Sequence, residues 1–202
     1  MTELHASNAM QISMLRIRDI LATSPVPEDP GHAENTLQWL LRLAPNADDA
    51  LRLAALAHDI ERARPSRLRR EQFDDYDAFK AQHAETGARI ASEILTESGI
   101  EPALRIEVCR LISRHEIGGD PRSDLLKDAD SLSYFDHNLP LYFAREGWEE
   151  TLRRARWGYQ RLSMRARDHY DDIRHENPAL QRLIAEARCL KHTKGGFIKT
   201  QT

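Results

Sequence analysis

The stretch LRLAALAHDIERARP, residues 51–65, places a histidine and an aspartate directly after an apolar run. Imidazole and carboxylate groups lose their hydration when they are buried, and an unpartnered group then costs several kcal/mol. His58 and Asp59 therefore require hydrogen-bond partners, opposite charges or a bound metal ion. Which of these they have depends on the other residues that the fold brings to them.

The elements that position this pair read as helices throughout, because apolar residues recur at spacings of three and four along the chain. No segment alternates apolar and polar residues for the length of a strand, so we expect an all-α fold. Proline, glycine and asparagine separate the segments. We expect helices over residues 10–22, 30–44 with Asp29 as the cap, 47–62, 78–98, 101–116, 123–136, 148–170 and 178–190.

Four further polar residues fall on or beside the apolar faces of these helices. His115 follows Leu111 by one helical step of four, so it faces inward. His83 shares its row with small residues that let a neighbouring helix approach, and His32 and Asp130 lie at the edges of apolar faces. Together with His58 and Asp59, five elements each offer a polar group to the interior.

A single histidine on an apolar face is more often a hydrogen-bonded core residue than a ligand. The set is stronger than its members, because imidazole nitrogens and carboxylate oxygens from separate helices form the mixed donor set that binds divalent metals. We expect one or two ions of Mn, Fe, Co, Ni or Zn, with Mg as an alternative. Such an ion would also compensate the buried pair at 58 and 59.

The order of these residues resembles the HD-domain metal-dependent phosphohydrolases, all-helical proteins with a histidine, a His-Asp doublet and a distant aspartate. That order reads here as His32 in DPGHAEN, His58 and Asp59 in ALAHDIERA, and Asp130 in LKDADSLSYFD. Members with two metals carry two more histidines between the doublet and the last aspartate. The segments AQHAETGARIA and ISRHEIGG, which contain His83 and His115, match these positions. The resemblance covers residues 30–137.

The resemblance implies a helical bundle and the hydrolysis of a phosphoester by metal-activated water. It implies metal ligands at His32, His58, Asp59, Asp130, His83 and His115. Asp59 would be a catalytic residue because it bridges two ions. Arg62 would be a catalytic residue because it contacts the anionic substrate. With one metal only, the histidines at 83 and 115 would face the phosphate or transfer a proton instead. The substrate would be a nucleotide or another small phosphorylated metabolite.

Two departures from the family pattern leave alternatives open. Many members continue the doublet as His-Asp-Ile-Gly-Lys, whereas this chain has Glu61 and Arg62 at the last two places. Glu61 is either a solvated charge at a helix end or a support for the site. Asp128 is expected to support Asp130. A similar scaffold serves diiron oxygenases and non-catalytic nucleotide-binding modules, so both stand as alternative functions.

Composition sets the context for such a site. The 202 residues carry a formal net charge of −3 with 30% charged residues, which gives no reason to expect nucleic acid as a partner. We expect a single domain over 1–190, with its core at 30–137, a C-terminal helical extension at 148–190 and a polar tail at 191–202. We also expect a cytoplasmic protein without membrane contact, for which a homo-oligomer stays open.

An arginine-rich helix, RRARWGYQRLSMRAR, stands apart from the motif. Its apolar face explains it as well as a nucleic-acid groove would, but one arginine, such as Arg161, can reach a phosphate in a central pocket.

Overall fold

The computed structural model describes residues 2–189, and within this range the protein is all-α without a β-strand, as expected. The α-helices are α1 Thr2–Leu21, α2 Asp29–Leu43, α3 Asp49–Ala57, α4 Tyr76–Glu97, α5 Pro102–Arg114, α6 Pro121–Ser133, α7 Leu139–Arg161, α8 Met164–Tyr170 and α9 Pro178–Ala187. Short 3-10 helices, η1 Ile60–Ala63 and η2 Arg70–Gln72, lie between α3 and α4. A single π-helical turn, η3 Tyr134–Asn138, joins α6 to α7.

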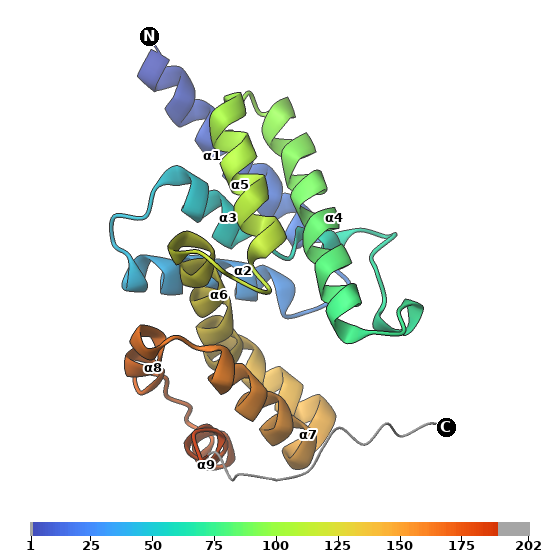
Figure 1. The fold of residues 1–202 in the computed structure, drawn as a ribbon, viewed down its shortest axis with the longest axis vertical. Helices are drawn as coiled ribbons and strands as arrows, with labels where there is room; N and C mark the ends of the chain where they lie inside the picture. The colour runs from blue at the N-terminus through green and yellow to red at the C-terminus, as the bar shows by residue number, and fades with distance from the viewer. Residues whose placement is uncertain (1, 190–202) are drawn as a thin grey trace.

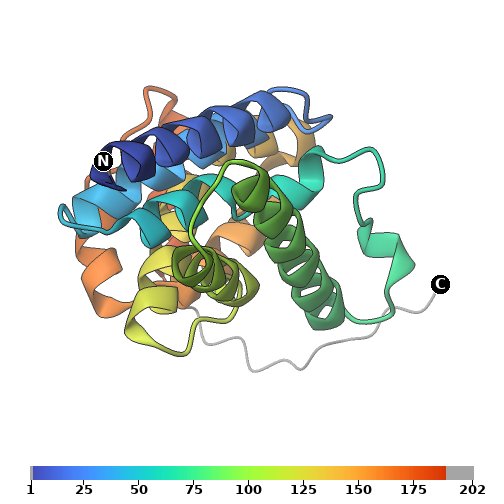
Figure 2. The ribbon, with the colours of Figure 1, turned by 90° about the horizontal axis from the view of Figure 1, so that it is seen from above.

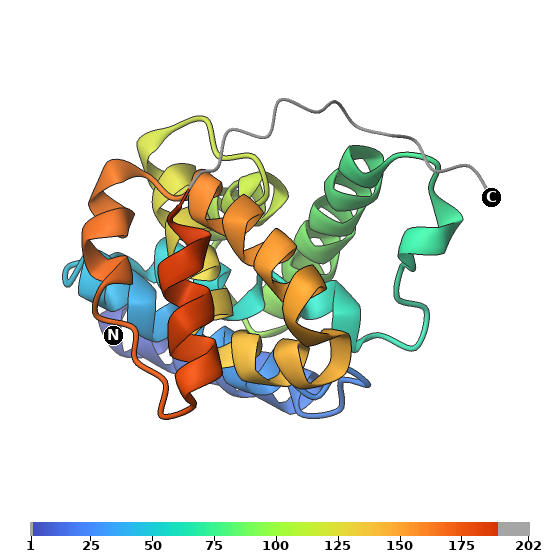
Figure 3. The same cartoon turned by 90° about the horizontal axis from the view of Figure 1, so that it is seen from below.

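Helix α6 lies in the middle of the molecule, between α1–α5 on one side and α7–α9 on the other (Figure 1). Helices α4 and α5 pack against each other, and α3 packs on both α2 and α5. Seen from above, the connection between α3 and α4 extends outward from the helices (Figure 2). Seen from below, α9 lies along α7 (Figure 3).

The short helix α3 is the most deeply buried element, because its sequence DALRLAALA is apolar on nearly every side. A helix that is apolar all round must be enclosed by others. Its Leu53 and Leu56 are fully buried, as are Trp39 of α2, Leu111 of α5 and Phe135 of η3. The chain that leaves the end of α3 therefore starts in the centre of the protein.

Several helix ends differ from the sequence expectation. The prediction of an unbroken helix over 148–170 was wrong, since α7 ends at Arg161 and the Ser163 side chain caps the start of α8. Helix α7 also begins earlier, at Leu139, and bends at Gly147, whose φ of 76° is accessible mainly to glycine. Asp29 is the first residue of α2 rather than its cap. The division into domains stays a prediction, and the expected tail at 191–202 lies outside the described residues.

Within residues 2–189, no helix has both the length and the apolar character needed to cross a bilayer.

Candidate metal centre

His58 and Asp59 lie at a break in the chain rather than inside a helix. The helix expected to continue to Arg62 ends at Ala57, and the 3-10 helix η1 follows from Ile60. Consecutive residues of an α-helix point about 100° apart. The break lets both side chains face one centre. Gly87 of α4 packs on this turn, where a Cβ would lie 3.3 Å from the carbonyl oxygen of His58.

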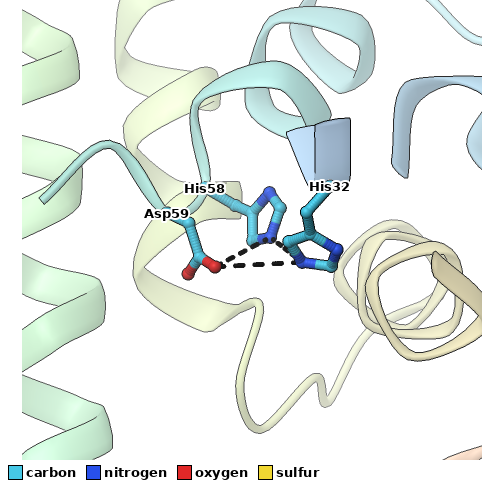
Figure 4. Close-up of side chains that lie close together, drawn as sticks. All are labelled: His32, His58 and Asp59. Carbon is cyan, nitrogen blue, oxygen red and sulfur yellow. Dashed lines mark hydrogen bonds and ion pairs between the residues drawn. The ribbon is translucent and has the colours of Figure 1, made fainter. Parts of the chain in front are cut away.

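Four side chains from three segments converge at this turn. The Nε2 atoms of His32 and His58 lie 3.2 Å apart, and Asp130 Oδ1 lies 3.1 Å and 3.7 Å from them. Asp59 Oδ2 lies 3.8 Å from the first ring nitrogen and 3.7 Å from the second. Figure 4 shows the two imidazoles and the Asp59 carboxylate turned toward a common point. The fold thus brings together all four residues expected to form the first metal site.

The other ring nitrogens are also hydrogen-bonded. His58 Nδ1 donates to the carbonyl oxygen of Ala55 at 2.9 Å, so the Nε2 of this ring, when neutral, is a lone-pair acceptor. Ser133 Oγ lies 2.9 Å from His32 Nδ1 and 3.1 Å from the carbonyl oxygen of His32. His32 Nε2 lies between His58 Nε2 and Asp130 Oδ1, at 3.2 and 3.1 Å. A proton on His32 Nε2 or a metal cation at this point satisfies both neighbours.

The spacing of these donor atoms fits a metal ion. Ligands held at about 2.0–2.2 Å in a tetrahedron lie roughly 3.3–3.6 Å from one another. Five of the six distances among the four groups run from 3.1 to 3.8 Å and bracket that range, and His32, His58 and Asp59 place their ligand atoms within 4.8 Å of one another. The donor set of two imidazoles and two carboxylates suits the first-row divalent metals expected from the sequence.

A second group lies on the other side of the same aspartate. Asp59, His83 and His115 each place a potential ligand atom within 4.8 Å of the others, and all three are buried. Asp59 Oδ1 lies 2.9 Å from His83 Nε2, while Oδ2 belongs to the first group. His115 Nδ1 donates to the carbonyl oxygen of Ile112 at 2.7 Å, which leaves its Nε2 as an acceptor. The two oxygens of Asp59 thus serve two separate groups of donors.

Glu61 holds His83 in this arrangement. Its Oε2 lies 2.8 Å from His83 Nδ1, and its Oε1 accepts from the backbone of Leu68. The side chain is only 2% exposed. Of the two alternatives for Glu61, the structure therefore favours support for the site over a solvated charge. The local sequence does not show that Glu61 is buried, because its partner His83 is 22 residues away.

Arg62 lies against Asp59 and a further acid that sequence reasoning missed. Its Nη1 donates to Asp59 Oδ2 at 2.7 Å and its Nη2 lies 2.9 Å from Asp29 Oδ1. The Asp29 side chain is fully buried, whereas the guanidinium-bearing side chain is 33% exposed. Arg62 thus orients the aspartate of the doublet and compensates a second buried carboxylate.

The charges of the centre shift its pKa values in opposite directions. Burial would raise the pKa of Asp59, but Arg62 and His58 outweigh it and hold that pKa well below its usual value. Burial likewise lowers the pKa of an imidazole. Asp59 and Asp130 overcome this at His58 and raise its pKa to about 9. Hydrogen bonds with Asp59 and Glu61 raise the pKa of His83 to about 10. Protons therefore supply the positive charge when no metal does.

Asp130 and Asp128 point in different directions from α6. Burial would raise the pKa of Asp130, but His32 and His58 outweigh it and keep the pKa well below its usual value. Asp128 instead accepts hydrogen bonds from the backbone and the hydroxyl of Ser163, at 2.9 and 2.5 Å. Two residues correspond to about 200° around a helix, so one carboxylate faces the centre and the other supports the start of α8. The expected support of Asp130 by Asp128 is absent.

The centre opens into a cavity of about 550 Å³. Asp59, His83, His115 and Asp130 line one part of it. The other walls carry the cationic side chains Arg62, Arg67, Arg69, Arg70, Lys80, Arg154 and Arg161, and the aromatic side chains Tyr76, Phe79, Tyr134, Tyr142 and Trp157. Arg161 reaches the cavity as the sequence suggested, and its Nη2 lies 3.8 Å from Asp130 Oδ2.

A family model described as a domain of unknown function, DUF4202, matches residues 5–184. No curated protein matches the chain, and no solved structure matches it. Since the family model covers most of the sequence, including every residue of the candidate metal centre, the protein belongs to the DUF4202 family.

Proposed function

We propose that this protein is a metal-dependent phosphohydrolase of the HD type, which cleaves a phosphoester of a nucleotide or another small phosphorylated metabolite. The observation that carries the proposal is the convergence of His32, His58, Asp59 and Asp130, with the Nε2 atoms of the two histidines 3.2 Å apart. These four residues occur in the HD order along the chain. Two imidazoles and two carboxylates at this spacing suit a divalent metal.

The lining of the cavity suits an anionic substrate. Seven arginine and lysine side chains line its walls, namely Arg62, Arg67, Arg69, Arg70, Lys80, Arg154 and Arg161, against the five acidic side chains of Asp59, Glu61, Glu71, Glu116 and Asp130. Guanidinium and ammonium groups form charge-assisted hydrogen bonds with phosphoryl oxygens, so this lining favours a phosphorylated substrate. The same cavity also argues against a purely structural role for the buried histidines.

The side chains divide into ligands and substrate contacts. His32, His58, Asp59 and Asp130 would hold one ion, and Asp59 with His83 and His115 a second. When bound, such an ion makes a water molecule more acidic and draws charge from a phosphoryl oxygen. Arg161 stands beside Asp130, where it can donate to the phosphoryl group. Arg62 keeps the Asp59 carboxylate turned to both groups, and its exposed part faces the cavity.

Metal analysis followed by a substrate panel tests this function. The protein is purified without chelator, its metal content is measured, and phosphomonoesters, phosphodiesters and nucleotides are assayed. The same panel is then run after chelation and after each of Mn, Fe, Co, Ni, Zn and Mg is restored. We expect hydrolysis of at least one substrate, lost on chelation and regained with a metal. A protein that binds none of these metals contradicts the proposal.

A further inference from the structure

One face of α7 forms the cavity wall beside the metal centre. Arg154, Trp157 and Arg161 are spaced three and four residues apart, so they project from the same side of the helix. The first turns of α4 add Tyr76 and Lys80 to this wall. We call these five residues the cationic wall. It continues from the candidate metal centre, because Arg161 lies 3.8 Å from Asp130.

The indole of Trp157 is surrounded by positive charge. The charged ends of Lys80, Arg154 and Arg161 lie 5.3, 5.3 and 4.7 Å from the centre of its ring. Such cation–π contacts hold the three side chains in place and occupy the surface on which a flat base would otherwise stack. The wall therefore presents positive charge to a ligand rather than an open aromatic ring.

The charges of the wall are unequally compensated. Glu116 lies 3.2 Å from Arg161 and 3.9 Å from Lys80, so it pairs with both. Arg154 donates to the Tyr76 hydroxyl at 3.0 Å and lies over aromatic rings. Among the ion pairs of residues 2–189, none joins Arg154 to a carboxylate. A guanidinium in a cavity wall without an acidic partner is a binding group for an anion.

Tyr134 also lines the cavity beside Arg154. The guanidinium of Arg154 lies 5.5 Å from the centre of this tyrosine ring. The Tyr134 hydroxyl itself is buried, so the tyrosine supports Arg154 and does not donate to the ligand.

We propose that Arg154, with Lys80 and Tyr76, forms a second anion subsite, and that the substrate carries another anionic group besides the phosphoryl group at the metal centre. This inference rests on the proposed function, which places the first phosphoryl group at the metal centre. Arg161 and Arg154 are seven residues apart, which is on the order of 10 Å along a helix. Bisphosphates with a sugar or nucleoside between their anions have the required shape.

Binding of matched ligand pairs tests the subsite without relying on hydrolysis. Isothermal titration compares adenosine 3′,5′-bisphosphate with adenosine 5′-monophosphate, and fructose 1,6-bisphosphate with fructose 6-phosphate. A charge-assisted hydrogen bond contributes about 1.5–3 kcal/mol, so wild-type protein should bind at least one bisphosphate about 10- to 100-fold more tightly than its partner. The Arg154→Gln variant should lose most of this preference.

The neighbouring Arg153 provides the matched control. Its side chain is 72% exposed and pairs with Glu150 outside the cavity lining, so Arg153→Gln should keep the preference of the wild type. If Arg154→Gln does not fold, Lys80→Gln carries the same test, since its ammonium lies over the same indole. A preference that depends on these residues supports the subsite even when no phosphoester is hydrolysed, and only the proposed function then fails. Equal affinities within both pairs, or a preference that survives the substitution, overturn the subsite.

Discussion

His32 and His58 place their Nε2 atoms 3.2 Å apart while the Nδ1 atom of each ring is hydrogen-bonded to an oxygen. His58 donates through its Nδ1, so the Nε2 of its neutral ring is a lone-pair acceptor for a proton or a metal cation. Two carboxylates face the same point, Asp59 and Asp130. This relationship is the physical basis for a metal centre in this protein.

The first prediction separates the two aspartates of α6. Asp130→Asn should lower the metal affinity by at least about 10-fold, more than the loss of a residue that only supports a ligand, because an amide oxygen is a weaker ligand than a carboxylate. Asp128→Asn should leave the metal content unchanged and cost about 1 kcal/mol of stability, since it weakens the hydrogen bonds to Ser163. Metal analysis and thermal unfolding of both variants provide the check. A greater loss of metal in Asp128→Asn than in Asp130→Asn would show that α6 directs the Asp128 carboxylate to the centre.

The second prediction concerns the number of ions. His83→Ala and His115→Ala should each remove one ion and spare the other, because these histidines share only Asp59 with the first group. Elemental analysis of purified wild type and both variants measures this directly. One ion per chain in all three proteins would reject the second site and leave the two histidines to face the substrate.

The third prediction tests Glu61. Glu61→Gln should weaken binding of the second ion by about 10- to 100-fold while the first ion stays bound, because the hydrogen bond to His83 Nδ1 loses its negative charge. Glu71, which also lines the cavity, offers a matched acid as control in Glu71→Gln. Equal metal binding by the Glu61→Gln variant and the wild type would mean that this carboxylate serves the fold alone.

The fourth prediction is a pH dependence of the metal-free protein. The pKa of His58 is raised to about 9 and that of His83 to about 10, both above the usual value of 6.5. A raised histidine pKa stabilises the folded state fully below about pH 6.5, and this contribution is lost as pH rises through the folded value. The unfolding temperature of the chelated protein should therefore fall between pH 7 and pH 10.

A bound metal replaces these protons, so the metal-loaded protein should show a smaller fall over the same pH range. The His83→Gln variant serves as the control after chelation, because it lacks one of the two raised groups. If chelated wild type and this variant lose the same stability between pH 7 and pH 10, the imidazole at 83 does not carry the proton assigned to it.

The sequence predicted the helices and the inward-facing ligands because both depend on local periodicity. His115 follows Leu111 by four residues, and that spacing alone directs it to the interior. Asp130 was distinguished from Asp128 by the family pattern, and their separation around a helix explains why only one reaches the centre. The all-α fold and the grouping of buried histidines and aspartates followed from these patterns.

What the sequence did not predict depends on contacts between distant segments. The end of α3 at Ala57 depends on the chain turning against Gly87 of α4, which no local pattern records. The burial of Glu61 depends on His83 and Leu68. From the arginine-rich helix the sequence singled out Arg161 and not Arg154, whose hydrogen bond in the cavity wall is to Tyr76, 78 residues away.

The central claim is that Asp59 joins two groups of metal ligands, and its most direct test is the metal content of Asp59→Ala. The variant removes the carboxylate shared by His32 and His58 on one side and by His83 and His115 on the other. We predict that it retains the helical circular dichroism of the wild type but loses bound metal from both groups, together with any phosphoester hydrolysis. An Asp59→Ala protein with the full metal content of the wild type would contradict the account.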